Sequence, residues 1–144
     1  GAEVARQLSG EGARLILTGR SIEKLRALQN QLASETLIYC CDLTNTAEQQ
    51  GLLQFCQQQG GIDVLINNAG ISQFGLVAQQ DYAAQLGTNL LMPMLLTQTL
   101  LPELQRKPEA MIVNVGSAFG SIGYPGFSGY SASKTELQYG KAAV

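Results

Sequence analysis

The sequence contains no histidine and no tryptophan, and charged residues make up only 14% of its 144 positions. The missing histidine excludes a Ser-His-Asp triad and any imidazole-based metal site within this stretch of chain, so we expect no metal. The formal net charge of −2 gives no basic surface of the kind that nucleic acids or anionic membranes attract. No nucleic-acid partner is therefore expected.

Cysteine is scarce and long hydrophobic runs are absent. The three cysteines, Cys40, Cys41 and Cys56, are an odd number without zinc-like spacing. We interpret them as buried free thiols of a reducing compartment, which predicts a cytoplasmic location. The longest apolar stretch, near residues 90–101, contains Pro93 and several polar residues and is too short to span a bilayer. No signal peptide is visible, and no membrane span is expected.

Short apolar segments alternate with amphipathic ones along the rest of the chain. The apolar segments predict strands at 13–18, 36–41, 62–67 and 111–115. Helical periodicity predicts helices at 2–8, 22–32, 47–59 and 82–104, the last disturbed at Pro93, and a further helix from 130. Strands that alternate with helices are typical of βαβ units, so we expect an α/β fold with a buried parallel sheet.

Polar residues and glycines follow each predicted strand. They are Thr18-Gly19-Arg20, Asp42, Asn67 to Gly70, and Gly116-Ser117. Ligands of open α/β sheets bind outside the carboxyl ends of the strands. The same edge of the sheet is therefore the predicted binding site.

Tyr130 and Lys134 lie four positions apart in the last predicted helix and so share one face of it. A nearby ammonium favours the ionised form of a phenol, which lets a tyrosine exchange a proton with a substrate oxygen near neutral pH. Ser117 could donate a hydrogen bond to the same oxygen. On spacing alone, a solvated surface pair remains the alternative.

The segment Asn67-Asn68-Ala69-Gly70, then Asn89, Ser117 and Tyr130-x-x-x-Lys134, together resemble the short-chain dehydrogenase/reductase family. The resemblance extends to about Lys134 and implies a Rossmann-like, doubly wound parallel sheet and an NAD(P)-dependent carbonyl/alcohol oxidoreductase. It implies that Tyr130 is the general acid/base, that Ser117 places the substrate oxygen, and that Lys134 favours the phenolate and binds the nicotinamide ribose. Asn89 would hold a water of the proton relay; alternatively it is a buried residue that mends the helix near Pro93.

The resemblance also implies the cofactor contacts. Asn68, Ala69 and Gly70 would line the cofactor through their backbone, unless they form a plain turn. Asp42 would accept a hydrogen bond from the adenine amino group, with Leu43 beside the ring, unless Asp42 caps the next helix. Gly1 aligns with the last glycine of the family's phosphate-binding turn.

Cofactor choice depends on the end of the predicted strand at 13–18. NAD-binding enzymes place an acidic residue there. This chain has Gly19 followed by Arg20, whose guanidinium suits a 2′-phosphate, and Ser21 could add a hydroxyl. NADP(H) is therefore predicted over NAD(H); Arg20 as a solvated surface charge is the alternative.

The chain departs from the family at both ends. It lacks the first strand, most of the glycine-rich turn, and the substrate-binding segment after Lys134, so we interpret residues 1–144 as a single, truncated domain. The missing strand would lie between 13–18 and 62–67 and would leave both neighbours unpaired. The pyrophosphate of a cofactor would also lose its glycine-rich turn, which predicts poor cofactor binding and little activity by this polypeptide alone. The last helix is expected to end early, at Gly140. By resemblance, the full-length form would be a homodimer or homotetramer.

Residues 119–127 are rich in aromatic and apolar side chains, which predicts a small hydrophobic carbonyl or alcohol substrate. Two other functions stay open. Ser131-Ala-Ser-Lys134 fits the Ser-x-x-Lys acyl-transfer motif, although no Lys-Thr-Gly or Ser-Asp-Asn element accompanies it. The chain could also be a catalytically silent nucleotide-fold fragment that acts only by binding or that needs its missing segments.

Overall fold

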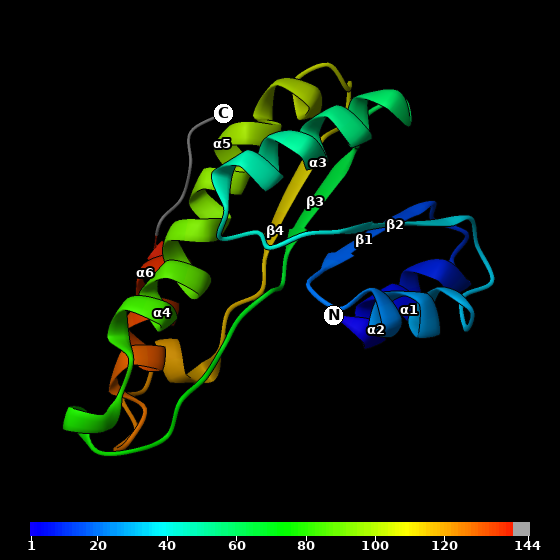
Figure 1. The fold of residues 1–144 in the computed structure, drawn as a ribbon. Helices are drawn as coiled ribbons and strands as arrows, with labels where there is room; N and C mark the ends of the chain where they lie inside the picture. Colours follow the sequence, from blue (N-terminus) through cyan, green and yellow to red (C-terminus); the bar gives the residue numbers. More distant parts are fainter. Residues whose placement is uncertain (140–144) are drawn as a thin grey trace. The chain divides into compact units, whose positions relative to one another are not determined.

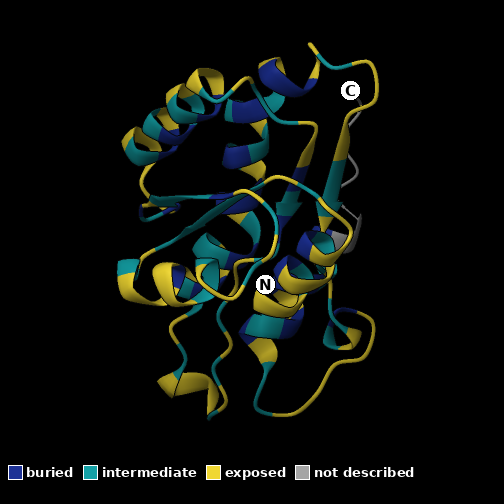
Figure 2. Cartoon of the chain, turned by 90° about the vertical axis from the view of Figure 1, so that its right-hand side faces the viewer, coloured by how far each residue is buried: buried dark blue, intermediate teal, exposed yellow. Residues whose placement is uncertain are grey.

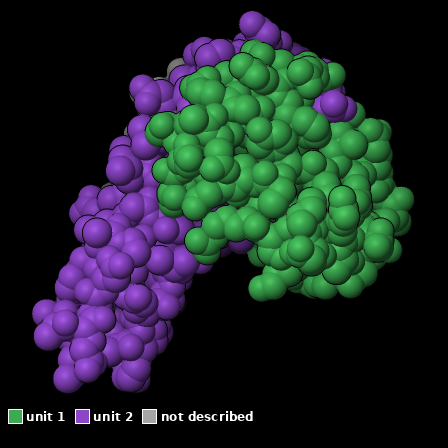
Figure 3. All heavy atoms as spheres, in the orientation of Figure 1, with its two compact units in different colours: residues 1–58 green, residues 59–144 purple. Residues whose placement is uncertain are grey.

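The computed structural model describes residues 1–139 and forms two compact units (Figure 3). We refer to residues 1–58 as the N-terminal unit and to residues 59–144 as the C-terminal unit.

The N-terminal unit is built from two parallel strands and three helices (Figure 1). Strands β1 (Leu15–Gly19) and β2 (Thr36–Cys40) pair in parallel, with Leu15 opposite Thr36. Helix α2 (Ile22–Gln29) connects them and packs against both strands. Helices α1 (Ala2–Gly10) and α3 (Thr46–Gln58) precede β1 and follow β2.

Local capping explains where these helices begin. Ser21 starts α2 by accepting a hydrogen bond from Lys24 N at 3.3 Å. Asn45 does the same for α3, because its Oδ1 accepts from Ala47 N at 2.9 Å. Both are residue types that satisfy the unpaired N–H groups of a first helical turn.

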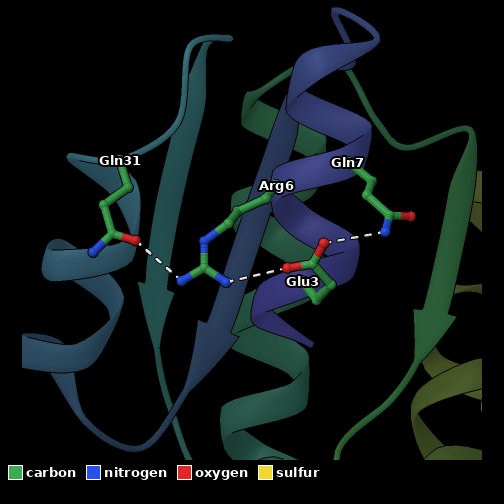
Figure 4. Close-up of polar contacts among 4 residues, drawn as sticks. All are labelled: Glu3, Arg6, Gln7 and Gln31. Carbon is green, nitrogen blue, oxygen red and sulfur yellow. Dashed lines mark hydrogen bonds and ion pairs between the residues drawn. The ribbon is translucent and has the colours of Figure 1, made fainter.

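Polar contacts join α1 to the segment that follows α2 (Figure 4). Arg6 donates one hydrogen bond to Gln31 Oε1 at 3.1 Å and another to Glu3 at 3.5 Å, and Gln7 donates to Glu3 at 3.1 Å. The buried Ser9 hydroxyl accepts from Ala33 N and Ser34 N, each at 2.9 Å. These contacts hold α1 to the same unit as the strands.

The C-terminal unit repeats the parallel arrangement. Strands β3 (Val64–Asn67) and β4 (Met111–Asn114) pair in parallel, with Val64 opposite Met111. Between them lie a 3₁₀ turn (Val77–Gln79), α4 (Tyr82–Leu86), a π-helical turn (Gly87–Leu91) and α5 (Met92–Leu104). A second 3₁₀ turn (Ala118–Gly120) and α6 (Ser128–Tyr139) follow β4.

Helix α5 carries the largest apolar stripe of this unit. Met92, Leu96, Leu100 and Leu104 recur every fourth residue and are all buried. Figure 2 colours the buried residues of the chain dark blue. A spacing of four keeps side chains on one face of a helix. Helix α5 also contacts β3, the strand that leads to the candidate site.

The structure confirms the predicted order of strands and helices. The described strands form two separate two-stranded sheets, β1–β2 and β3–β4, as expected for a chain that lacks the strand between 13–18 and 62–67. The predicted helix 82–104 is interrupted by the π-helical turn just before Pro93, a residue that has no N–H to donate within the helix. One correction concerns the cysteines: Cys40 is exposed, whereas Cys41 and Cys56 are buried, and none of the three forms a disulfide. The expected helix end at Gly140 lies outside the described residues.

Within residues 1–139, no helix combines the length and the apolar character that a membrane crossing requires.

Candidate active site

Helix α6 places Tyr130 and Lys134 one turn apart. The chain enters the helix through Gly126, whose φ of +85° is a conformation that glycine adopts without strain. Ser131 N then donates to Phe127 O at 2.8 Å and closes the first turn. Tyr130 is half-buried, and only 4% of Lys134 is exposed. Tyr130 and Lys134 therefore face the interior of the unit. This argues against the alternative of a solvated surface pair.

The Lys134 ammonium is fixed beside the Tyr130 ring. Its Nζ donates to Val115 O at 2.9 Å and lies 6.0 Å from the ring centroid. Burial lowers the pKa of Lys134, because desolvation disfavours the charged form. An ammonium has three donors, and among the described residues only the Val115 carbonyl accepts from it. The other two have no acceptor among the described residues.

Ser117 lies on a segment that contacts α6 both before and after this residue. Val115, two residues earlier, accepts from Lys134, and the Phe119 ring, two residues later, meets the Tyr130 ring edge-on with centroids 6.3 Å apart. Ser117 Oγ accepts from Phe119 N at 3.2 Å and starts the 3₁₀ turn. The segment that carries Ser117 thus runs alongside α6 from Lys134 toward Tyr130.

Asn89 is completely buried, and its side chain joins two other segments. Its Nδ2 donates to Ile71 O at 2.8 Å and to Ser133 Oγ at 3.0 Å, and its Oδ1 accepts from Ile71 N at 2.8 Å. The alternative was that Asn89 satisfies backbone groups of its own helix near Pro93. The structure does not show this, because the Asn89 side chain bonds to Ile71 and Ser133 instead. Both amide donors are committed to the protein, so the predicted water relay has only the remaining acceptor capacity of this side chain.

Gly70 is held close to both Asn89 and Lys134. A Cβ atom added at Gly70 would lie 3.2 Å from Asn89 Oδ1 and 3.6 Å from Lys134 Nζ. The exposed Gly70 therefore adjoins the ammonium, while Ala69 is exposed and Asn68 is half-buried just before it. A glycine backbone next to an ammonium fits a ligand that carries hydroxyl groups.

The other predicted cofactor residues lie in the N-terminal unit, at the ends of its strands. Arg20 and Ser21 follow β1, and Asp42 and Leu43 follow β2. Cys41 N donates to Gly19 O at 2.9 Å, which brings the two strand ends together. Gly1 stands at the N-terminal cap of α1, and its carbonyl accepts from Ala5 N.

Asp42 forms a local turn and does not cap α3. Its Oδ1 accepts from Thr44 N at 2.9 Å and from Thr44 Oγ1 at 2.7 Å, while Asn45 caps α3. The Thr44 hydrogen bonds, and more weakly the charge of Arg20, lower the pKa of Asp42. A carboxylate that stays ionised beside Arg20 remains a hydrogen-bond acceptor at the strand ends.

Sequence reasoning missed two residues near Tyr130. The Phe74 ring lies 5.2 Å from the Phe127 ring, and Gln80 hydrogen-bonds to the backbone just before Tyr130. Phe74 is a single aromatic residue in a loop, and the partners of Gln80 are three main-chain groups and the Gln85 side chain. Neither produces a spacing pattern that could have revealed it.

Comparisons with known proteins identify the family of the chain. The family model described as short chain dehydrogenase matches residues 1–139. Nodulation protein G of Rhizobium meliloti (strain 1021) is 36% identical over 141 residues, which cover 95% of this chain and 58% of that protein. The 3-oxoacyl-acyl-carrier-protein reductase of Bos taurus is 35% identical over 141 residues, covering 95% of this chain and 60% of that protein.

Solved structures are similar over nearly the whole chain. A metagenomic short-chain oxidoreductase in complex with NADP has a TM-score of 0.89 at 31% identity, covering 96% of this chain and 66% of that one. Actinorhodin polyketide ketoreductase with NADPH has a TM-score of 0.88 at 30% identity, covering 94% of this chain and 56% of that one. The fold is thus Rossmann-like, with its sheet only partly formed. The chain belongs to the short-chain dehydrogenase family, whose curated members it matches over about three fifths of their length.

Proposed function

We propose that the whole protein is an NADP(H)-dependent oxidoreductase that reduces a carbonyl, or oxidises a secondary alcohol, with Tyr130 as the acid/base. The observation that carries this proposal is the buried Lys134 ammonium, fixed by Val115 beside the Tyr130 ring. A charge that is kept out of water is costly unless it interacts with other groups. A phenolate formed at Tyr130 and a bound ribose would both supply such interactions.

The side chains divide the proton chemistry among them. In the reducing direction Tyr130 Oη gives its proton to the substrate oxygen, and the Lys134 ammonium stabilises the phenolate that remains. Ser117 donates a hydrogen bond to the same oxygen and fixes its position. Asn89 holds Ser133 and Ile71, which keeps α6 and the loop at Gly70 in place. NADPH, when bound, supplies the hydride that completes the alcohol.

The preference for NADP(H) is supported by the end of β1. Gly19 stands where an acidic residue would repel a 2′-phosphate, and the next residue is the exposed Arg20. The Ser21 hydroxyl already donates to Glu23 at 3.0 Å and caps α2, so Arg20 carries most of the expected selectivity. Both structural neighbours described above were solved with NADP or NADPH.

The substrate we propose is a small hydrophobic ketone, aldehyde or alcohol. Four aromatic rings form a connected cluster beside Tyr130, with neighbouring centroids 5.2 to 6.0 Å apart; they belong to Phe74, Phe119, Tyr124 and Phe127. Phe74 and Tyr124 are 75% and 55% exposed, so they present apolar surface. Apolar surface next to a reacting oxygen favours substrates with an apolar group on the carbonyl carbon.

The test is the substitution Tyr130→Phe in the full-length protein. NADPH oxidation with a hydrophobic ketone should fall about 10²- to 10⁴-fold, since the proton donor is lost. NADPH binding, measured by cofactor fluorescence, should be retained. Tyr39→Phe is the matched control, because that ring packs on Phe55 in the N-terminal unit and should leave turnover unchanged. Normal turnover by Tyr130→Phe would refute the assigned acid.

A second candidate function is that of a silent fragment that only binds, or that needs further segments. Its support is that the chain matches 58% to 60% of the length of its curated relatives. Assembly into a homodimer or homotetramer, with no nucleic-acid partner, is proposed for the full-length form only. Cys41 and Cys56 are buried and form no disulfide, which favours a reducing compartment, and we propose the cytoplasm.

A further inference from the structure

The side-chain amide of Gln80 connects two loops of the C-terminal unit. Its Nε2 donates to Gly75 O and to Gly126 O, each at 3.0 Å, and its Oε1 accepts from Gly129 N at 3.1 Å. Both amide protons and the amide oxygen are therefore engaged. These three partners are main-chain groups, at Gly75, at Gly126 before α6 and at Gly129 in the first turn of α6; the Gln80 oxygen also accepts a longer hydrogen bond from Gln85 Nε2, at 3.4 Å.

The backbone groups that Gln80 holds determine how α6 begins. Gly129 N belongs to the first turn of α6, where N–H groups have no partner within the helix. Gly126 has the positive φ that turns the chain toward the helix, and its carbonyl also accepts from Gly75 N at 3.0 Å. Gln80 thus supplies from a distant loop the acceptor that a capping residue supplies locally.

Close packing reinforces this connection. A Cβ atom added at Gly129 would lie 2.7 Å from Gln85 Nε2 and 2.9 Å from Tyr82 Cδ1, so α4 approaches the start of α6 as closely as a glycine allows. The Tyr82 and Ser128 hydroxyls share a hydrogen bond at 2.9 Å. The first turn of α6 is consequently held by the segment that follows β3.

We propose that Gln80 is a positioning residue, which sets the orientation of Tyr130 by fixing the first turn of α6. Tyr130 immediately follows Gly129. Lys134, one turn later, has a separate attachment through Val115, and Thr135 donates to Gly120 O at 2.8 Å. Loss of Gln80 therefore loosens the Tyr130 end of the helix, which keeps its Tyr82–Ser128 and Gly75–Gly126 hydrogen bonds, while the Lys134 end stays attached. The catalytic consequence rests on the proposed function.

The kinetic test compares Gln80→Ala with Gln79→Ala in the full-length protein. Gln79 is the neighbouring, exposed glutamine and is the matched control. Rates are normalised to the concentration of NADPH-binding sites, so that unfolded molecules are not counted. Gln80→Ala should lower kcat about tenfold or more, because small displacements of a reacting group are costly, while the Kd of NADPH and the KM of the carbonyl stay close to wild type. Gln79→Ala should match wild type.

A second measurement does not depend on turnover. Hydrogen–deuterium exchange of the same variants should show faster exchange at residues 126–131 in Gln80→Ala and unchanged exchange at 132–137. Unchanged exchange at 126–131 would overturn the inference, whatever the activity. Faster exchange there with a normal kcat would limit Gln80 to a structural role and overturn its role in positioning Tyr130. A wild-type protein that exchanges as expected but has no turnover would refute the proposed function and leave the structural step intact.

Discussion

At the scale of single residues, Lys134 combines burial, charge and attachment in one side chain. Only 4% of it is exposed, yet its ammonium has a single described acceptor, the Val115 carbonyl. Burial lowers its pKa from the ordinary value of 10.5. The folded protein therefore releases this proton at a lower pH than the unfolded chain does. Between those two values the unfolded state binds more protons, so raising the pH favours the folded state.

This linkage predicts a pH-dependent difference between wild type and Lys134→Met. As pH rises through the lowered pKa toward 10.5, the free energy of unfolding of the wild type should increase relative to that of the variant. Urea denaturation at a series of alkaline pH values measures the free energy of unfolding of the wild type and of the variant. Parallel pH profiles for the two proteins would show that burial does not shift this lysine.

The residues of the site differ in how far the sequence reveals them. One helical turn separates Tyr130 and Lys134, and the resemblance, which also includes Ser117, singled the three out as a predicted site. Gln80 could not be predicted, since its partners are backbone groups that every sequence contains and one glutamine side chain that belongs to no motif. The hydrogen bonds from the Asn89 amide to Ile71 and Ser133 could not be predicted either. They join a loop and a helix that are far apart in the sequence.

At the scale of elements, the start of α6 depends on a glycine that is crowded. Gly129→Ala would place a methyl group 2.7 Å from Gln85 Nε2 and 2.9 Å from Tyr82 Cδ1. Overpacking of this kind costs about 1–3 kcal/mol, and the better helix propensity of alanine offsets up to about 1 kcal/mol of it. We expect a lower free energy of unfolding in urea.

Gly10→Ala is the matched control for that prediction. Gly10 also lies in a helix, but a Cβ atom there would have no neighbour within 4 Å. Helix propensity alone should then make this variant neutral or stabilise it by up to about 1 kcal/mol. Equal effects of the two substitutions would mean that the start of α6 relaxes and that the close approach to α4 is not required.

Most elements could be predicted because their apolar spacing is local. The apolar residues of 36–41 and 62–67 are enough to predict β2 and β3, and Ser21 is enough to predict the start of α2. The π-helical turn could not be predicted. The sequence showed that Pro93 would disturb a helix, but not which residues would form hydrogen bonds over five positions instead of four. The separation into two sheets could be predicted from the missing strand between 13–18 and 62–67, whereas the register of each strand pair is non-local and is seen only in the structure.

At the scale of the whole molecule, each described sheet has only two strands. Within residues 1–139, β1 pairs with β2 and β3 pairs with β4. Backbone groups on the other edges of β1 and β3 therefore lack strand partners in this part of the chain, and such edges are weak points of a sheet. This agrees with a chain that matches only 58% of the length of a curated relative.

We therefore predict that the 144-residue polypeptide binds NADPH weakly and turns over little carbonyl substrate. The family's glycine-rich turn, which binds the pyrophosphate, has at most its last glycine here, at Gly1. Fluorescence titration with NADPH and a reductase assay, each run beside the full-length protein, measure the difference. Robust turnover by the short polypeptide would show that its two units suffice for catalysis.

The π-helical turn at Gly87–Leu91 limits which insertions and deletions the sequence can accept. An α-helix rotates by about 100° per residue, so a turn with wider spacing shifts the angular phase between the helices on either side of it. Helix α4 contacts α6, and α5 contacts β3, through faces whose relative phase this turn sets. Deleting one residue here would turn Tyr82 and Gln85 away from α6 while leaving α5 unchanged. Insertions and deletions in this short turn are therefore far less tolerable than its position between two ordinary helices suggests.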